Sequence, residues 1–192
     1  MKAPALRPAP LFGLLARLVS QVTPLRPRAV ARPAARDRTG GHIALVGAGP
    51  GARDLMTLRA VDRLRAADVV FYDRLVDPAV LDFARPEAER VYVGKTVGNC
   101  AWPQPEIDRL IVREARQGRR VVRLKSGDPS IFGRAAEELE AARAAGIEAE
   151  LVPGITAASA AAATTGRPLT ERGETDTFVI STGTCRPGDA AP

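Results

Sequence analysis

The sequence predicts an α/β protein built on a parallel β-sheet. From His42 onward, short apolar runs alternate with amphipathic segments, which is the pattern of strands joined by helical crossovers. Each of the first five runs also ends in glycine or polar residues. The carboxyl ends of parallel strands meet at one edge of a sheet, where ligands bind in open α/β folds. The sequence therefore favours a ligand site at that edge.

The alternation places each element along the chain. Strands are expected at 42–49, 68–73, 89–94, 119–130, 147–154 and 177–182. Helices are expected at 54–67, 77–84, 103–118, 133–146 and 155–166. Asp54 is a good N-cap for the first helix, and Gly118 and Gly146 are typical helix ends. This order favours a parallel sheet with helices on both faces.

The basic charge of the chain belongs to its first 41 residues. They hold eight Lys/Arg and one acid, a net charge of +7, so the remainder carries −1 of the chain's +6. In a nucleic-acid-binding protein the folded remainder of the chain would carry a basic patch of its own, so the charge distribution argues against nucleic-acid binding. Residues 1–41 are interpreted as a disordered basic extension or an over-long start of translation. An Arg-rich, acid-poor transit peptide is the alternative.

The sequence gives little indication of a metalloprotein, a disulfide-rich protein or a membrane protein. Cys100 and Cys185 lie far apart, and His42 is the single histidine, so no zinc or iron cluster is expected. A disulfide framework is not expected either, which makes a reducing cytoplasmic setting the default. The chain contains no apolar run long enough to span a bilayer.

The first glycine-rich loop raises a choice between two ligands. The pattern G-x-G-x-x-A, which begins at Gly47, matches the dinucleotide fingerprint, and Asp73 lies where a ribose-binding acid would be expected. However, Pro50 removes a backbone donor, and the expected cap Asp54 comes too late for the helix to meet a pyrophosphate at the glycines. The loop is therefore interpreted as a surface for close approach and not as a phosphate cradle.

Several segments together resemble the tetrapyrrole methylase family. They are VGAGPGARDLMTLRA, VVFYDRLV, YVGK, PQPEIDRLIVREARQGRRVVRLKSGDPSIFGRAAEEL and LVPGITAASAAAA, in the family's order and spacing, between about Ile43 and Phe178. The resemblance implies two α/β domains that enclose S-adenosyl-L-methionine. It also implies methylation of uroporphyrinogen III to precorrin-2, on the way to sirohaem or cobalamin, by a homodimer. From the charge distribution and the lack of a long apolar run, no nucleic-acid or membrane partner is expected.

The resemblance divides the chain into three parts. Residues 1–41 lie outside it, 42–154 correspond to the N-terminal α/β methylase domain, and 155–192 correspond to the start of a second α/β domain that is incomplete here. A truncated methyltransferase is therefore expected. Two alternatives stay open: an inactive or weakly ligand-binding fragment, and a sibling methylase that acts on another corrinoid precursor.

The resemblance also implies the site residues. The cofactor contacts would be Pro50, Ser126, Gly127, Asp128, Ile131, Thr156 and Ala157. Asp73 would be the general base and Lys95 the proton donor, although without the family Asp73 would be interpreted as a loop carboxylate paired with Arg74. The substrate carries acetate and propionate groups, so cationic clamps are expected. The candidates are Arg74 and Arg134, followed by Arg123 and Lys125.

Three positions depart from the family's pattern. Ser126 and Ser130 stand where the family usually has glycine and phenylalanine, and Glu171 replaces a histidine. A serine at 126 keeps the turn small but reduces its backbone freedom. Ser130 removes an aromatic wall, which leaves the choice among tetrapyrroles open.

Overall fold

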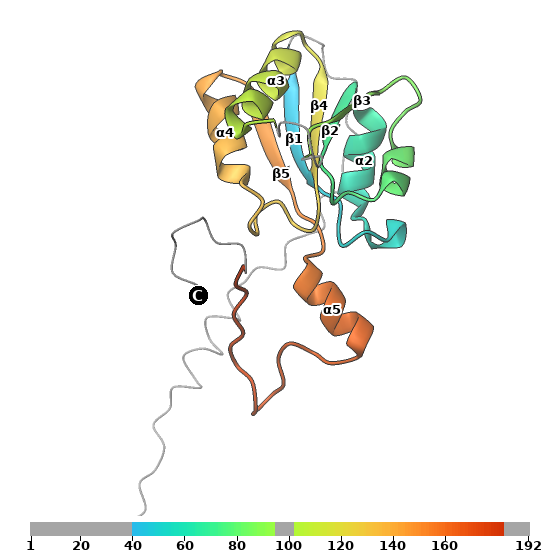
Figure 1. The fold of residues 1–192 in the computed structure, drawn as a ribbon, viewed down its shortest axis with the longest axis vertical. Helices are drawn as coiled ribbons and strands as arrows, with labels where there is room; N and C mark the ends of the chain where they lie inside the picture. The colour runs from blue at the N-terminus through green and yellow to red at the C-terminus, as the bar shows by residue number, and fades with distance from the viewer. Residues whose placement is uncertain (1–39, 95–101, 183–192) are drawn as a thin grey trace, which may run out of the picture. The chain divides into compact units, whose positions relative to one another are not determined.

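The computed structural model describes residues 40–94 and 102–182. Its centre is a five-stranded sheet in the order β3-β2-β4-β1-β5, and every pair of neighbours is parallel (Figure 1). The strands are β1 (His42–Gly47), β2 (Val69–Tyr72), β3 (Glu89–Tyr92), β4 (Arg120–Lys125) and β5 (Glu148–Val152). The predicted α/β fold with a parallel sheet is confirmed.

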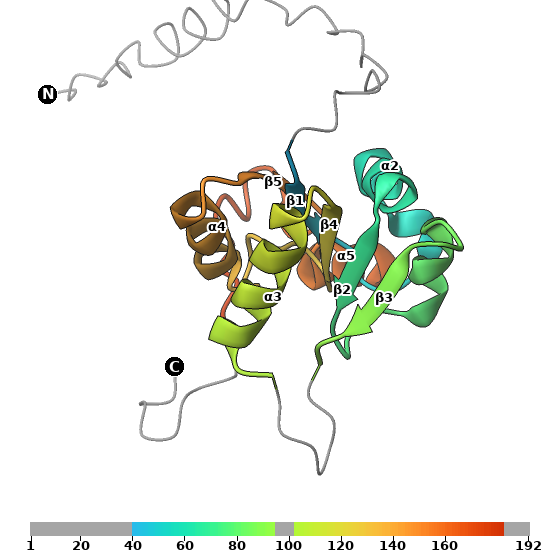
Figure 2. The same cartoon turned by 90° about the horizontal axis from the view of Figure 1, so that it is seen from above.

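Helices cover both faces of this sheet. The α-helices are α2 (Leu58–Ala66), α3 (Gln104–Arg116), α4 (Ala135–Ala144) and α5 (Ala157–Thr165), and two 3₁₀ helices are η1 (Arg53–Leu55) and η2 (Pro78–Phe83). Helices α3 and α4 lie on one face, and α2 and η2 lie on the other (Figure 2). No helix in the described part of the chain is long and apolar enough to cross a membrane.

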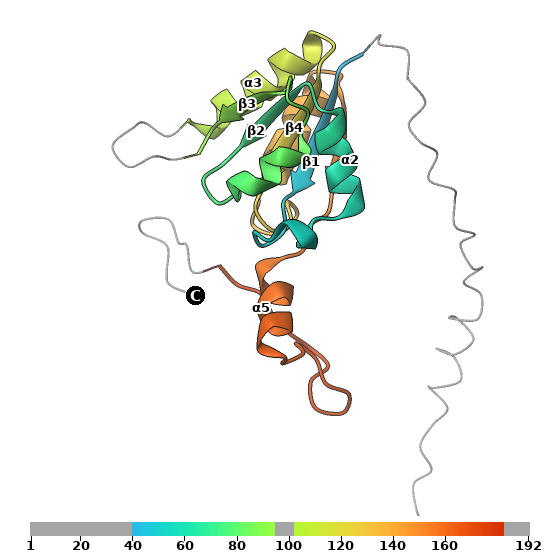
Figure 3. The same ribbon diagram turned by 90° about the vertical axis from the view of Figure 1, so that its right-hand side faces the viewer.

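The alternation of side chains along the strands produces two cores. In β1, Ala44 and Val46 are buried against α2 and η2, whereas Ile43 and Leu45 are buried against α3 and α4. Successive strand residues point to opposite faces, so a strand covered on both sides must be apolar throughout. This explains why β1 is a continuous apolar run, and Figure 3 shows the sheet between α2 and α3.

The first helix begins later than the sequence predicts. The N-cap of α2 is Thr57, whose hydroxyl accepts a hydrogen bond from the Ala60 amide at 3.2 Å. Asp54, the predicted cap, lies in η1 instead, so that prediction is wrong. The Thr57 hydroxyl also donates to the Pro153 carbonyl at 3.4 Å. This long-range contact favours Thr57, and local sequence cannot reveal it.

The predicted sixth strand at 177–182 does not form in the structure. A strand exists through backbone pairing with a neighbour. The edges of the sheet are β3 and β5, and neither is paired with this segment. Phe178 and Val179 are 50% and 84% exposed, so the segment is not held by side-chain burial either.

Candidate functional site

The order of the strands decides which loops are neighbours at the carboxyl edge. Because β1 lies between β4 and β5, the loops after these three strands adjoin one another. They carry the predicted cofactor residues at 50, at 126–131 and at 156–157. Asp73 follows β2, the strand next to β4. The topology thus brings Asp73 to the same edge of the sheet as the predicted cofactor residues.

The backbones of the three cofactor loops interlock through glycines. Gly49 and Gly127 exchange hydrogen bonds of 3.2 and 2.8 Å, and Gly127 has a left-handed φ of +66°. A Cβ on Gly47 would lie 2.6 Å from the Gly127 oxygen, and one on Gly154 would lie 2.1 Å from the same atom. No side chain fits at those distances, so these glycines form a closely packed floor. Sequence analysis singled out Gly127 but missed what Gly47 and Gly154 do.

Asp128 joins the loop after β4 to the loop after β5. Its Oδ2 accepts a hydrogen bond from the Gly154 amide at 3.2 Å. Its Oδ1 accepts from the Ser130 amide at 2.8 Å and from the Ser130 hydroxyl at 2.5 Å. Ser130 therefore adds a hydrogen bond that phenylalanine could not make. Two carboxylate oxygens offer about four acceptor positions, so Asp128 can still accept from a ligand.

The loop between Asp128 and α4 is held in an unusual conformation. Phe132 and Arg134 have left-handed φ values of 53° and 54°. Such a conformation costs a bulky residue about 1 kcal/mol or more, and it clusters at functional sites. The loop borders a hollow lined by Pro129, Ser130, Phe132, Gly133, Arg134, Ala135, Ala136, Leu139 and Leu151. Ile131, a predicted cofactor contact, is half-buried in the same loop.

The two predicted substrate clamps are both exposed. Arg134 is paired with Glu137 at 2.6 Å, and this hydrogen bond raises the pKa of the Arg134 guanidinium. A substrate carboxylate at Arg134 would therefore compete with Glu137. Arg74 follows Asp73, and its amide lies 2.6 Å from the place where a Cβ on Gly94 would sit. The end of β3 thus abuts the loop after β2.

Asp73 is placed at the carboxyl end of β2 with its side chain 28% exposed. Its Oδ1 accepts a hydrogen bond from the Leu75 amide at 3.2 Å, and its Oδ2 lies 3.5 Å from Nη2 of Arg123. The carboxylate is therefore oriented by the protein and still reachable from the edge. Lys95, its predicted partner in proton transfer, lies outside the described residues.

Arg123 and Lys125 are not open substrate clamps. Both are buried on the face of β4 that α3 and α4 cover, with 4% and 5% exposure. Nε of Arg123 lies 3.0 Å from Oε1 of Glu138 on α4, and Nζ of Lys125 lies 2.9 Å from both oxygens of that carboxylate. Burial, followed by repulsion from Arg123, lowers the pKa of Lys125. Sequence analysis missed Glu138, although the alternation in RVVRLK places residues 121, 123 and 125 on one face.

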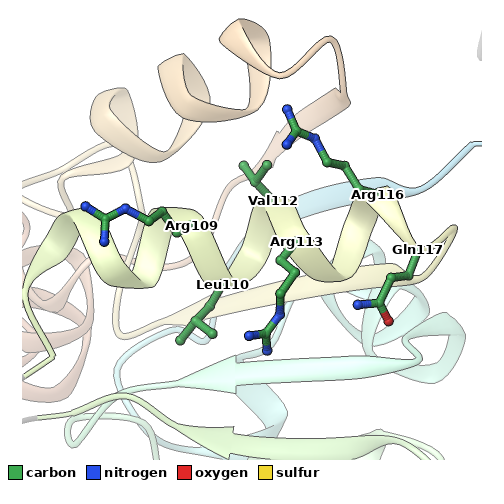
Figure 4. A pocket seen from close by; sticks show the side chains of 6 residues that line it. All are labelled: Arg109, Leu110, Val112, Arg113, Arg116 and Gln117. Atoms are coloured by element: carbon green, nitrogen blue, oxygen red, sulfur yellow. The ribbon is translucent and has the colours of Figure 1, made fainter.

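A second hollow lies along α3, on the half that ends beside the amino edge of the sheet (Figure 4). It is lined by Arg109, Leu110, Val112, Arg113, Arg116 and Gln117. It is the larger of the two hollows, but its lining offers cations and no carboxylate or nucleophile. Among the described residues, no group of three His, Cys, Asp or Glu could hold a metal ion.

The chain is similar to proteins of one known family. A family model for Tetrapyrrole (Corrin/Porphyrin) Methylases matches residues 42–191. A siroheme synthase of Tolumonas auensis is 52% identical over 158 residues, which cover 82% of this chain and 34% of that protein. Siroheme synthase 1 of Serratia proteamaculans is 54% identical over 149 residues, covering 78% and 31%. The chain thus spans about a third of the length of these curated relatives.

Solved structures show the same fold. The uroporphyrin-III C-methyl transferase of Thermus thermophilus, complexed with S-adenyl homocysteine, is 45% identical with a TM-score of 0.65. The match covers 79% of this chain and 63% of that one. A cobalt precorrin-4 methyltransferase is 34% identical with a TM-score of 0.61, and the match covers 68% and 52%.

Proposed function

Since the chain belongs to the tetrapyrrole (corrin/porphyrin) methylases, we propose that it carries one wall of the active site of an S-adenosylmethionine-dependent uroporphyrinogen-III C-methyltransferase, which makes precorrin-2. The observation that carries the proposal is the glycine floor formed by the loops after β1, β4 and β5, with the Asp73 carboxylate beside it after β2. Relatives that are about half identical over this region support the choice of reaction.

The residues at the floor fit S-adenosylmethionine. The cofactor has no phosphate, so the exposed Pro50 and the late start of α2 at Leu58 are no obstacle. The half-buried Ile131 offers an apolar surface for adenosine, and Asp128 offers acceptor positions for ribose hydroxyls or the ammonium group. Further contacts would come from Ser126, Gly127, Thr156 and Ala157. The bound cofactor supplies a methyl group on a sulfonium, which a pyrrole carbon attacks.

The role of this chain's own residues is to move a proton and hold the substrate. Methyl transfer to a fully substituted pyrrole carbon leaves a positive charge on the ring, which the loss of a proton from elsewhere on the macrocycle neutralises. Asp73 is proposed to accept that proton, since it is oriented by Leu75 and is partly exposed. Lys95 is proposed as the proton donor. Arg74 and Arg134 are proposed to bind the acetate and propionate groups, because a guanidinium matches the geometry of a carboxylate.

The test compares two aspartates whose carboxylates accept the same kind of hydrogen bond. Asp73 accepts a hydrogen bond from the amide of Leu75, and Asp77 accepts one from the amide of Ala79, two residues further on in each case. In the full-length protein, Asp73→Asn should lower the transfer of labelled methyl from S-adenosylmethionine to uroporphyrinogen III by about 10²- to 10⁴-fold. Asp77→Asn should retain most of the activity, and both variants should still bind the cofactor in calorimetry.

Two outcomes would contradict the proposal. If the unaltered protein methylates another corrinoid precursor but not uroporphyrinogen III, it is a sibling methylase. If it methylates no tetrapyrrole, the chain belongs to an inactive or merely ligand-binding protein. We also propose that the protein works in the cytoplasm, as the lack of a disulfide framework favours, and that it is a homodimer, as the family resemblance implies. Light scattering of the full-length protein tests the dimer.

A further inference from the structure

A cluster of buried charged side chains contacts Asp73 through Arg123. Its centre is Glu138, whose side chain is fully buried. Glu138 Oε1 is approached by Arg123 at 3.0 Å, by Lys125 at 2.9 Å and by the Gln104 amide at 3.2 Å, while Oε2 is approached by Lys125 at 2.9 Å. Burying ionised groups is costly unless each is paired and hydrogen-bonded, so this cluster is a specific feature of the fold.

Arg123 connects this cluster to the reactive edge. Its Nε faces Glu138, its Nη1 donates to the Leu124 carbonyl at 3.0 Å, and its Nη2 lies 3.5 Å from Oδ2 of Asp73. Arg123 is paired across the sheet with Phe71, two residues before Asp73, so the guanidinium reaches along one face toward the strand end. These three contacts fix its orientation, and one of them is with Asp73.

From this geometry we propose that Glu138 and Arg123 are positioning residues for Asp73, with Glu138 holding the guanidinium so that it orients the Asp73 carboxylate without pairing fully with it. The proposal rests on the function proposed above for Asp73. The guanidinium contacts Glu138 at 3.0 Å and Asp73 at 3.5 Å, so its tighter bond is to the buried carboxylate. A tight pair with Asp73 would weaken that carboxylate as a base.

The charges around Asp73 set the sign of each test. Arg123 and Lys125 of β4 face it from the neighbouring strand, Glu138 lies behind them on α4, and Arg74 follows it in the chain. From α3, Asp108 completes the surroundings of Glu138 through Gln104. Removing the Arg123 cation takes a positive charge away from the surroundings of Asp73, whereas removing the Glu138 carboxylate takes a negative charge away, so the two variants change its electrostatic environment in opposite directions.

The first measurement does not depend on activity. The carboxyl carbons of aspartate are labelled in the full-length protein, the Asp73 signal is assigned by its loss in Asp73→Asn, and its chemical shift is recorded by NMR. Arg123→Gln and Glu138→Gln should each displace this signal, because both disturb the guanidinium that lies 3.5 Å from Oδ2 of Asp73. An unchanged Asp73 signal in both variants would overturn the proposal, whether or not the protein methylates uroporphyrinogen III.

The second measurement separates positioning from simple structural support. Glu138→Gln leaves buried cations short of a partner and is the variant most at risk of misfolding. The double variant Arg123→Gln/Glu138→Gln loses one charge of each sign, so it should regain stability. If the pair positions Asp73, the double variant still has a kcat about tenfold below the unaltered protein. Recovery of activity together with stability would overturn the proposal.

Arg123→Lys serves as the conservative comparison. It keeps the charge but lacks the guanidinium fork that contacts Glu138 and Asp73 at once. Its Asp73 carboxyl signal should lie nearer that of the unaltered protein than the signal of Arg123→Gln does, while kcat still falls. If Arg123→Lys and Arg123→Gln gave the same Asp73 signal, the charge of residue 123 would have no influence there, and the proposal would be wrong.

Discussion

At the scale of single residues, Gly154 shows how close the loops at the carboxyl edge come to each other. A Cβ at this position would sit 2.1 Å from the Gly127 oxygen and 2.9 Å from the Gly47 Cα, both of which are backbone atoms. Neither atom belongs to a flexible side chain, so the steric clash can be removed only if the loops themselves move. Gly154→Ala should therefore destabilise the protein by about 2 kcal/mol, as overpacking does.

The same substitution should also damage the proposed cofactor site. Separation of the loops after β4 and β5 would break the bond from the Gly154 amide to Asp128. We expect at least about a tenfold loss of affinity for S-adenosylmethionine in calorimetry, equivalent to about 1.4 kcal/mol. Gly40→Ala is the matched control, because a Cβ there meets nothing within 4 Å. Equal stability of the two variants in urea would show that the loops can yield without cost.

At the scale of elements, the start of α2 depends on Thr57. The hydroxyl accepts from the Ala60 amide and donates to the Pro153 carbonyl, so it caps the helix and joins it to the end of β5. Thr57→Ala should lower the free energy of unfolding by about 1 kcal/mol, the usual cost of losing an N-cap. Thr57→Ser keeps the oxygen and should retain most of that stability, as measured by chemical denaturation.

Thr164→Ala is the control for this helix cap. The Thr164 hydroxyl donates to the Ala160 carbonyl one turn back within α5, at 2.9 Å, and caps no helix start. Because alanine has the higher helix propensity, this substitution should leave stability within about 0.5 kcal/mol. If Thr57→Ala were as stable as Thr57→Ser, the contact would have no capping value.

At the scale of the whole sheet, ion pairs that stabilise the fold gather near the amino ends of the strands, opposite the edge that carries the site. Asp68 accepts from the Arg120 amide at 2.8 Å and pairs with Arg85 at 2.7 Å. Glu114 contacts Arg119 at 2.5 Å. Burial alone would raise both carboxyl pKa values, but these hydrogen bonds and nearby cations outweigh it. The pKa of Asp68 lies below 3.8 and that of Glu114 below 4.5.

These lowered pKa values predict how stability depends on pH. The unfolded chain binds protons at Asp68 and Glu114 at a higher pH than the folded chain does, so their contribution is complete above the unfolded values of 3.8 and 4.5. It is lost as pH falls through the lower folded values. The free energy of unfolding should therefore decline from about pH 5 downward.

A pair of variants checks this origin of the acid sensitivity. Asp68→Asn removes one of the titrating groups, so it should be less stable at pH 7 and should lose less stability between pH 5 and pH 3 than the unaltered protein. Glu87→Gln, at an exposed position, is the control and should follow the unaltered protein. Urea denaturation at several pH values measures this. If the free energy of unfolding of Asp68→Asn fell with pH as steeply as that of the unaltered protein, the acid sensitivity would arise from other groups.

Local sequence patterns were enough for the elements that depend on local physics. The sequence correctly predicted β1 and β4 from their apolar runs and α3 from the spacing of its apolar residues. It also predicted that helices end at Gly118 and Gly146, and both glycines have left-handed φ values. The sixth strand failed because the apolar residues near Phe178 indicate a strand but cannot supply a partner. Asp54 failed as a cap because a distant carbonyl, that of Pro153, favours Thr57.

The sequence by itself determined the fold class, the family and the loops that carry the proposed site, because alternation, helical period and motif order are properties of neighbouring residues. Only the tertiary structure decided which of those loops meet, since the order β3-β2-β4-β1-β5 is not written in the chain order. It also decided the environment and the partners of Arg123. Next to valine and leucine it reads as an ordinary strand charge, yet burial beneath α4 forces it to pair with Glu138, and that pairing brings its guanidinium to Asp73.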